Sequence, residues 1–150
     1  MLKIYITLFV LFFFNLSAEI AQKLEVKGNN RISAETIRVY GDITIGKDYS
    51  AFDINQILKN LYDTDFFEDV KISLTDGVLD IFVKEYLYIN FVDLEGEKSK
   101  SIKKTVLERL KLKQKESFIE SKLSQDINLI KKMYATMGFN FVNVEPKIKK

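Results

Sequence analysis

The chain has 150 residues, with 23 Lys or Arg against 21 Asp or Glu, and this near balance of charge argues against a strongly basic nucleic-acid-binding protein. Hydrophobic residues make up 47% of the sequence and proline occurs once, so the chain can bury a core. Cysteine and histidine are both absent, which excludes disulfides, thiolate chemistry and the usual catalytic triads and zinc sites.

The start of the chain, over residues 1–18, has the pattern of a secretory signal peptide. Lys3 supplies a positive charge, an almost unbroken apolar run covers residues 4–16, and the small residue Ala18 precedes the charged Glu19. This run is too short to cross a bilayer, which takes roughly 20 residues. We therefore expect cleavage between Ala18 and Glu19 and export of the remaining chain. An uncleaved anchor and a buried core helix are the alternatives.

The next segment predicts a strand followed by two helices. Apolar and polar residues alternate over Leu24–Lys27, before a turn at Gly28-Asn29-Asn30. Ser33 can cap a short helix. Ser50 and Asp53 form a capping box, in which a hydroxyl and a carboxylate satisfy free N–H groups at the start of a second helix. The apolar face of that helix is formed by Ile54, Ile57, Leu58 and Leu61.

A β-hairpin is predicted next. Asp76-Gly77 supplies the two positive φ angles of a type I′ turn. Apolar residues alternate with polar ones on both sides of this turn, namely Val70, Ile72 and Leu74 before it and Leu79, Ile81 and Val83 after it.

The same pattern recurs in the second half of the chain. Gly28 and Gly96 stand in equivalent turns. These two glycines are 68 positions apart. Four later residues recur at a constant distance of 72 positions: Tyr62, Phe67, Val70 and Ile72 correspond to Tyr134, Phe139, Val142 and Val144. A repeat of this kind predicts two similar domains, over residues 19–85 and 86–150, behind a signal peptide over residues 1–18.

The second domain is expected to contain strands over residues 88–94 and 139–144. Between them we expect a helix around Val106 and a second helix that opens with a capping box formed by Ser117 and Glu120. Its inward residues are Leu123, Ile127, Ile130 and Tyr134. The return strand would fall at residues 150–156, so we expect this domain to lack its last strand and the sequence to be the front end of a longer protein.

Two stretches of the first domain resemble the POTRA repeat. They are V-K-G-N-N-R-I at residues 26–32 and L-Y-D-T-D-F-F-E-D-V-K-I at residues 61–72. The second domain adds Y-A-T-M-G-F at residues 134–139. Residues 23–150 are therefore similar to the first POTRA units of the BamA type of outer-membrane β-barrel assembly factor.

This resemblance implies an α+β fold of tandem β-α-α-β-β units, each with a three-stranded mixed sheet backed by two helices. It implies a non-enzymatic periplasmic segment, without cofactor or metal, that belongs to a protein of the outer membrane. The implied partners are unfolded outer-membrane protein precursors, periplasmic chaperones and assembly lipoproteins, with no nucleic acid. The membrane would be reached through a C-terminal barrel that is absent from this chain.

Two alternatives stay open. The chain could be a POTRA segment of another exported system, such as a two-partner secretion transporter, a translocation-assembly protein or a division protein. It could also be a secreted enzyme of another kind, which the absence of His and Cys disfavours.

The candidate binding site is the second strand of the first unit, which the resemblance places at a sheet edge. An open edge can accept an extended peptide through main-chain hydrogen bonds, with little demand on its sequence. The alternative is an edge that is merely tolerated and guarded by charges such as that of Lys71. The residues of the strand are Phe67, Glu68, Asp69, Val70, Lys71, Ile72, Ser73 and Leu74.

Two other groups of polar residues are weaker candidates for a functional site. Glu68 and Asp69 are adjacent carboxylates, but neighbours on a strand point to opposite faces, which is a poor geometry for shared acid–base work. A lysine cluster surrounds the first helix of the second unit and is either a solvated face or a patch for anionic headgroups. Its members are Lys98, Lys100, Lys103, Lys104, Lys111, Lys113 and Lys115.

Overall fold

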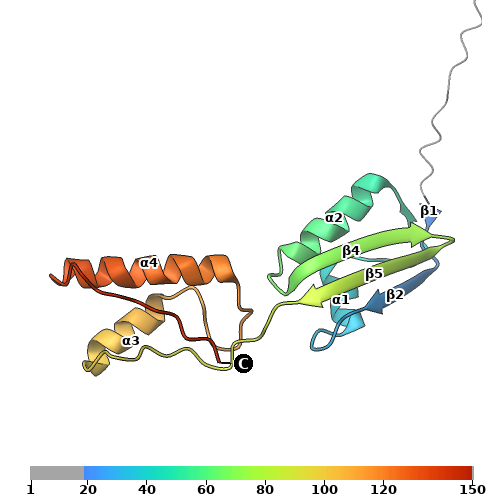
Figure 1. Cartoon of the computed structure of the whole chain (residues 1–150). Coiled ribbons are helices and arrows are strands. Elements are labelled where there is room, and N and C mark those ends of the chain that lie inside the picture. Colours follow the sequence, from blue (N-terminus) through green and yellow to red (C-terminus); the bar gives the residue numbers. More distant parts are fainter. Residues whose placement is uncertain (1–18, 150) are drawn as a thin grey trace, which may run out of the picture.

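The computed structural model describes residues 19–149, so the proposed signal peptide and Ala18 lie outside the described residues. The chain has the α+β architecture that the sequence predicts (Figure 1). Its elements are β1 (Glu19–Ile20), β2 (Lys23–Lys27), α1 (Ala34–Tyr40), β3 (Asp48–Tyr49), α2 (Ala51–Tyr62), β4 (Phe67–Thr75), β5 (Val78–Glu85), α3 (Lys100–Arg109) and α4 (Glu120–Thr136). Among the helices in residues 19–149, none combines the length and apolarity that crossing a membrane requires.

The main sheet has three strands in the order β2-β5-β4. The last strand in sequence is therefore central: β2 pairs with it in parallel and β4 in antiparallel orientation. The turn between β4 and β5 confirms the predicted hairpin, because Asp76 and Gly77 have φ angles of 53° and 75°. This mixed sheet leaves β4 at one edge.

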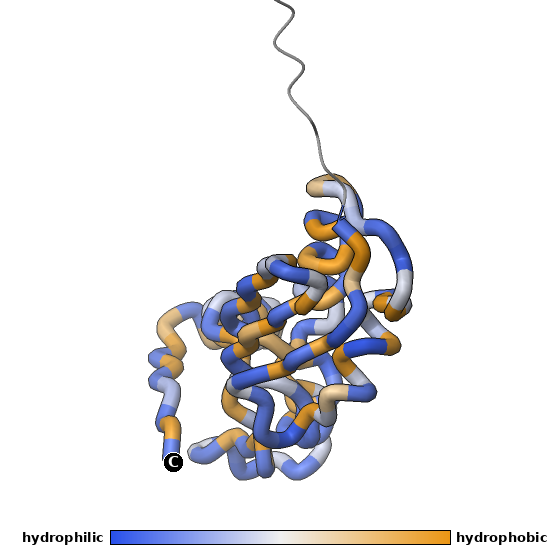
Figure 2. Tube along the Cα trace, turned by 90° about the vertical axis from the view of Figure 1, so that its right-hand side faces the viewer, coloured by the Kyte–Doolittle hydropathy of each residue, from blue (hydrophilic) through white to orange (hydrophobic). Residues whose placement is uncertain are grey.

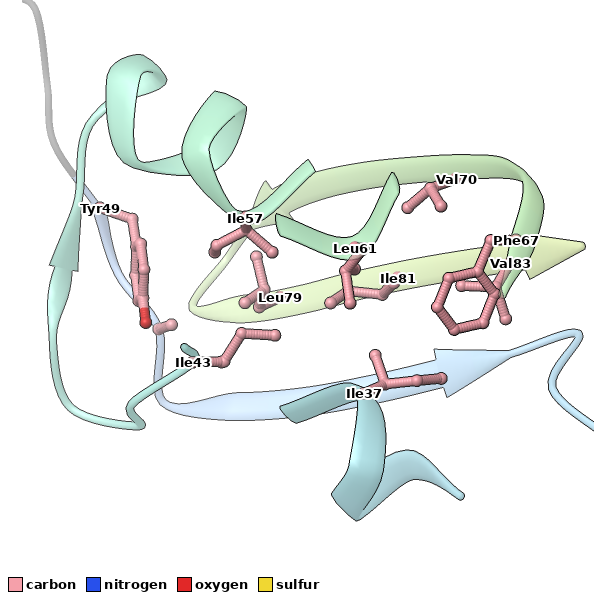
Figure 3. Packing of buried hydrophobic residues seen from close by; sticks show 11 residues of the cluster. Ile37, Ile43, Tyr49, Ile57, Leu61, Phe67, Val70, Leu79, Ile81 and Val83 are labelled. Atoms are coloured by element: carbon pink, nitrogen blue, oxygen red, sulfur yellow. The ribbon is translucent and has the colours of Figure 1, made fainter. Parts of the chain in front are cut away.

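Helices α1 and α2 contribute to one core with the central strand. Ile57 and Leu61 of α2 lie over Leu79 and Ile81 of β5, as Figure 3 shows, and Ile37 of α1 joins the same cluster. All five side chains are at most 3% exposed. Apolar and polar residues alternate along the strands (Figure 2), so burying one face leaves the other in solvent.

Both predicted caps of the first unit are present. The Ser33 hydroxyl accepts the N–H of Thr36 at 3.0 Å, and Ser50 and Asp53 form the complete capping box. The Asp53 carboxylate accepts the Ser50 hydroxyl at 2.5 Å and the Ser50 N–H at 3.0 Å. These bonds, with that from the Lys47 ammonium, lower the pKa of Asp53 from its ordinary 3.8 to about 2.

The lowered pKa makes the start of α2 sensitive to acid. Because the folded form holds Asp53 ionised, its contribution to stability is present above about pH 4 and is lost as the pH falls to about 2. We expect the gap in urea midpoint between the native chain and Asp53→Asn to narrow over this window. A gap that stays constant from pH 5 to pH 2 would contradict this role of Asp53.

The small sheet of β1 and β3 was not predicted. Glu19 pairs with Tyr49 and Ile20 with Asp48, in antiparallel orientation. The Tyr49 ring is 3% exposed, and its hydroxyl accepts the N–H of Thr44 at 2.8 Å. This short ladder ties the start of the described chain to the first unit.

The strands predicted for the second unit are wrong. Within residues 19–149, no strand forms over residues 88–94 or 139–144, apart from one isolated bridge between Tyr88 and Ser117. In the first unit both outer strands pair only with the central β5, and no strand equivalent to β5 forms within residues 86–149. Without that partner the two segments have no ladder to join.

The alternation in these segments still predicts which side chains turn inward. Val92, Leu94 and Val144 pack against a small core formed by Val106 and Ile130 together with Leu110. Apolar spacing therefore selects the buried face even where the backbone makes no ladder.

The second predicted capping box is also wrong. The N-cap of α4 is Ile119, with no side-chain hydrogen bond, while Ser117 is buried and bridges to Tyr88. A polar contact that was not predicted lies nearby. The carboxylate of Asp126, 3% exposed, accepts the backbone N–H groups of Lys111 at 2.7 Å and Leu112 at 2.9 Å. Asp126 thereby holds the loop between α3 and α4 against α4.

Candidate functional site

The free edge of β4 exposes backbone groups on a regular pattern. The Val70 N–H donates to the Tyr62 hydroxyl at 3.2 Å, so it points away from β5. Hydrogen bonds on a strand alternate in direction from residue to residue. The N–H and C=O groups of Ile72 and Leu74 therefore point the same way, beyond the edge of the sheet.

The residues that carry these outward groups are anchored by their side chains. Val70 is 5% exposed, and Ile72 and Leu74 pack against the core of the first unit. Lys71 and Ser73 between them are exposed. The free edge is therefore a row of backbone donors and acceptors on residues whose side chains pack against the core.

A β-bulge interrupts the first part of β4. The register shifts between Phe67 and Asp69, and both Glu68 and Asp69 lie outside the core. The prediction that the Glu68 and Asp69 side chains point to opposite faces of the sheet is therefore wrong, because the extra residue of a bulge interrupts the alternation of side chains along a strand. Glu68 pairs with Lys84 at 2.8 Å and Asp69 with Lys71 at 3.4 Å. Both carboxylates are engaged in surface ion pairs, which gives them no arrangement for acid–base chemistry.

A shallow hollow of about 270 Å³ lies on the solvent face of the sheet beside this edge. Phe82, 46% exposed, stands in it, with the Lys71 ammonium 5.8 Å from the ring centroid. Lys27 on the far side is paired with Asp80 at 2.7 Å. The hollow thus offers an aromatic surface between charged groups, next to the open backbone of β4.

The turn at residues 28–32 is held by a carboxylate that was not singled out from the sequence. Glu85, at the end of β5, has a side chain that is 8% exposed. Its Oε1 accepts the N–H groups of Asn30 at 2.8 Å, Arg31 at 3.0 Å and Ile32 at 2.9 Å. Successive N–H groups in such a turn form a concave anion site. This contact explains what G-N-N-R-I does in the fold.

The same turn reaches the second unit. The Arg31 guanidinium lies 4.8 Å from the centroid of the Tyr88 ring, just beyond the end of β5. On another part of the first unit, Asp65 pairs with Lys122 of α4 at 2.6 Å. The short connection after Glu85 is therefore flanked by two polar contacts between the units.

The charge of the lysine cluster is partly compensated by neighbouring groups. Lys103 pairs with Asp93 at 2.7 Å, and Lys113 donates to the carbonyl oxygens of Leu107 and Glu108 at the end of α3. A hollow of about 490 Å³ lies between several of these lysines. These contacts favour the solvated-face interpretation, and binding of anionic headgroups stays a prediction. Across the described part of the chain, no three acidic side chains gather as a metal site would require.

The sequence comparisons agree on one family. Residues 87–150 match the POTRA family, described as a surface antigen variable number repeat. The outer membrane protein assembly factor BamA of Neisseria meningitidis serogroup B (strain ATCC BAA-335 / MC58) is 31% identical over 132 residues, which is 86% of this chain and 16% of that protein. BamA of Neorickettsia risticii (strain Illinois) is 28% identical over 76 residues, covering 51% of this chain and 10% of that protein. The chain thus spans less than a fifth of the length of these relatives.

A solved structure shows the same fold. The N-terminal domain of Omp85 from Thermosynechococcus elongatus superposes with a TM-score of 0.54 at 18% identity, over 80% of this chain and 52% of that one. The family match lies in the second unit, while the first unit has the predicted mixed sheet with two helices. The chain therefore belongs to the POTRA proteins and is similar over most of its length to BamA.

Proposed function

We propose that this chain is the periplasmic receiving segment of a BamA-like assembly factor. Unfolded outer-membrane protein precursors would add to the free edge of β4 as an extra strand. The observation that carries this proposal is the open row of backbone groups at Ile72 and Leu74. Backbone pairing suits a receptor for many different sequences, since it demands an extended chain and little else.

The proposal also covers the domain organisation, the partners and the location of the protein. The two POTRA units would cover residues 19–85 and 86–150, after removal of residues 1–18 at the Ala18–Glu19 bond. Periplasmic chaperones and assembly lipoproteins would dock on the units. The protein would be held in the outer membrane through a C-terminal β-barrel. BamA relatives, whose names describe outer-membrane protein assembly, support this role.

Proline at Ile72 tests the edge directly. Ile72→Pro removes an outward N–H and sets a ring against an incoming strand, without removing a donor from the β4–β5 ladder. We expect it to weaken binding of a short extended peptide of alternating valine and threonine at least about tenfold, measured by fluorescence anisotropy with the purified chain.

The matched control is Ile72→Ala, which loses the same side chain but keeps the N–H. Both variants should lose stability from the core, whereas only the proline variant should lose peptide binding. Lys71→Pro serves a different purpose, because its N–H points toward β5 and its loss should disrupt the hairpin itself. Equal peptide affinities for folded Ile72→Pro and Ile72→Ala would overturn binding at this edge.

A further inference from the structure

Tyr62 closes one half of the edge that the proposed function uses. It is the last residue of α2, and its side chain reaches the start of β4 while staying 40% exposed. Its hydroxyl accepts the Val70 N–H at 3.2 Å and donates to the Asp69 carboxylate at 3.4 Å. The hydroxyl therefore occupies the Val70 N–H that an added strand would need.

The two halves of β4 consequently differ. Before Val70, the bulge at Phe67–Asp69 breaks the regular spacing of backbone groups, and Tyr62 takes the next outward donor. After Val70, Ile72 and Leu74 present outward groups that have no such guard in the described chain. A regular ladder can thus form only along the second half of the strand.

The counterpart tyrosine of the second unit does something else. Tyr134 takes the place of Tyr62 in the repeat and donates its hydroxyl to Glu97. Burial and this carboxylate raise the pKa of Tyr134 to about 12. Tyr62 therefore contacts a strand edge, whereas Tyr134 at the equivalent position of the second unit does not. The position in the repeat alone does not produce this contact.

We propose that Tyr62 is a specificity-determining residue that sets the register and length of the captured segment. This inference rests on the proposed function. A bound segment would pair with Ile72 and Leu74 and end opposite Val70, so the site would select short extended stretches of an unfolded chain. Longer stretches would gain nothing from the first half of β4, because its next outward donor is already bonded to Tyr62.

Hydrogen exchange tests the guard without any ligand. In the purified chain, the Val70 amide should exchange more slowly than those of Ile72 and Leu74. Tyr62→Phe removes only the hydroxyl and should raise the Val70 exchange rate about tenfold, the effect of losing one hydrogen bond. Tyr40→Phe is the matched control, since Tyr40 is also half exposed and its hydroxyl makes no hydrogen bond within residues 19–149. Val70 exchange as fast as that of Ile72 in the native chain would overturn the guard.

Peptide length tests the register. Alternating valine and threonine peptides of five and seven residues should bind the native chain and Tyr40→Phe with equal affinity. For Tyr62→Phe, the seven-residue peptide should bind about five- to tenfold more tightly than the shorter one, because the freed Val70 N–H adds a hydrogen bond. An equal length dependence in all three proteins would overturn the role of Tyr62 alone. No binding of either peptide to any protein would overturn the proposed function, and the register role with it.

Discussion

Replacing Gly28 with alanine is expected to destabilise the first unit by about 2–4 kcal/mol, a large part of the free energy of unfolding of a marginally stable domain. Gly28 has a φ of 82°, and a Cβ built on it would lie 2.2 Å from the carbonyl oxygen of Val83 and 3.2 Å from the Phe82 ring. The chain turns here directly against the central strand. A methyl group would force β5 away from the turn, and urea unfolding followed by circular dichroism measures the loss.

Gly46 provides the control for this experiment. Its φ is 87°, but a Cβ there would meet nothing within 4 Å. Gly46→Ala should therefore cost only the backbone strain, about 1 kcal/mol. The difference between the two alanine variants isolates the close approach to Val83. Equal losses for both would show that the turn moves away from β5 at little cost.

Loss of Glu85 is expected to have the second large effect. Glu85→Ala leaves the N–H groups of Asn30, Arg31 and Ile32 without their shared acceptor, in a place where the side chain was 8% exposed. We expect a loss of about 3 kcal/mol in the free energy of unfolding, since each unsatisfied donor costs about 1 kcal/mol. Glu85→Gln keeps one acceptor oxygen but not the charge, and should lose about half as much.

The consequences of Glu85→Ala should reach the second unit. Freeing the turn releases Arg31, whose guanidinium lies over Tyr88 at the start of that unit. We expect the NMR signals of residues 86–90 to shift together with those of residues 28–32. Glu68→Ala is the control, because the Glu68–Lys84 pair is exposed and should contribute at most about 1 kcal/mol. A Glu85→Ala variant as stable as Glu68→Ala would contradict the role of the carboxylate.

Glu85 and the turn that it holds also lie at the connection between the first unit and the second. Glu85 ends the central strand, and the backbone leaves it at once for the second unit. The turn it holds presents Arg31 to Tyr88, while Asp65 and Lys122 meet elsewhere across the connection. Both contacts involve side chains that are at least partly exposed, so salt should weaken them.

Local chemistry made much of the first unit predictable. Asp76-Gly77 favours positive φ angles, and Ser50 with Asp53 satisfies helix N–H groups within one turn of the chain. Both features act over short distances in the chain, so the residues that determine them stand side by side in the sequence. The apolar faces of α2 and of the hairpin follow from spacing alone for the same reason.

Features that join distant residues followed from the tertiary structure instead. Glu85 meets residues more than 50 positions before it, Asp126 meets loop residues 14 and 15 positions away, and no local pattern marks either carboxylate. The predicted strands at residues 88–94 and 139–144 failed for a related reason. Their alternation selects a buried face, but a strand also needs a neighbour for its backbone, and the described chain holds no counterpart of β5 for them. Side-chain spacing can be read one residue at a time, whereas backbone pairing depends on which segments the fold brings together.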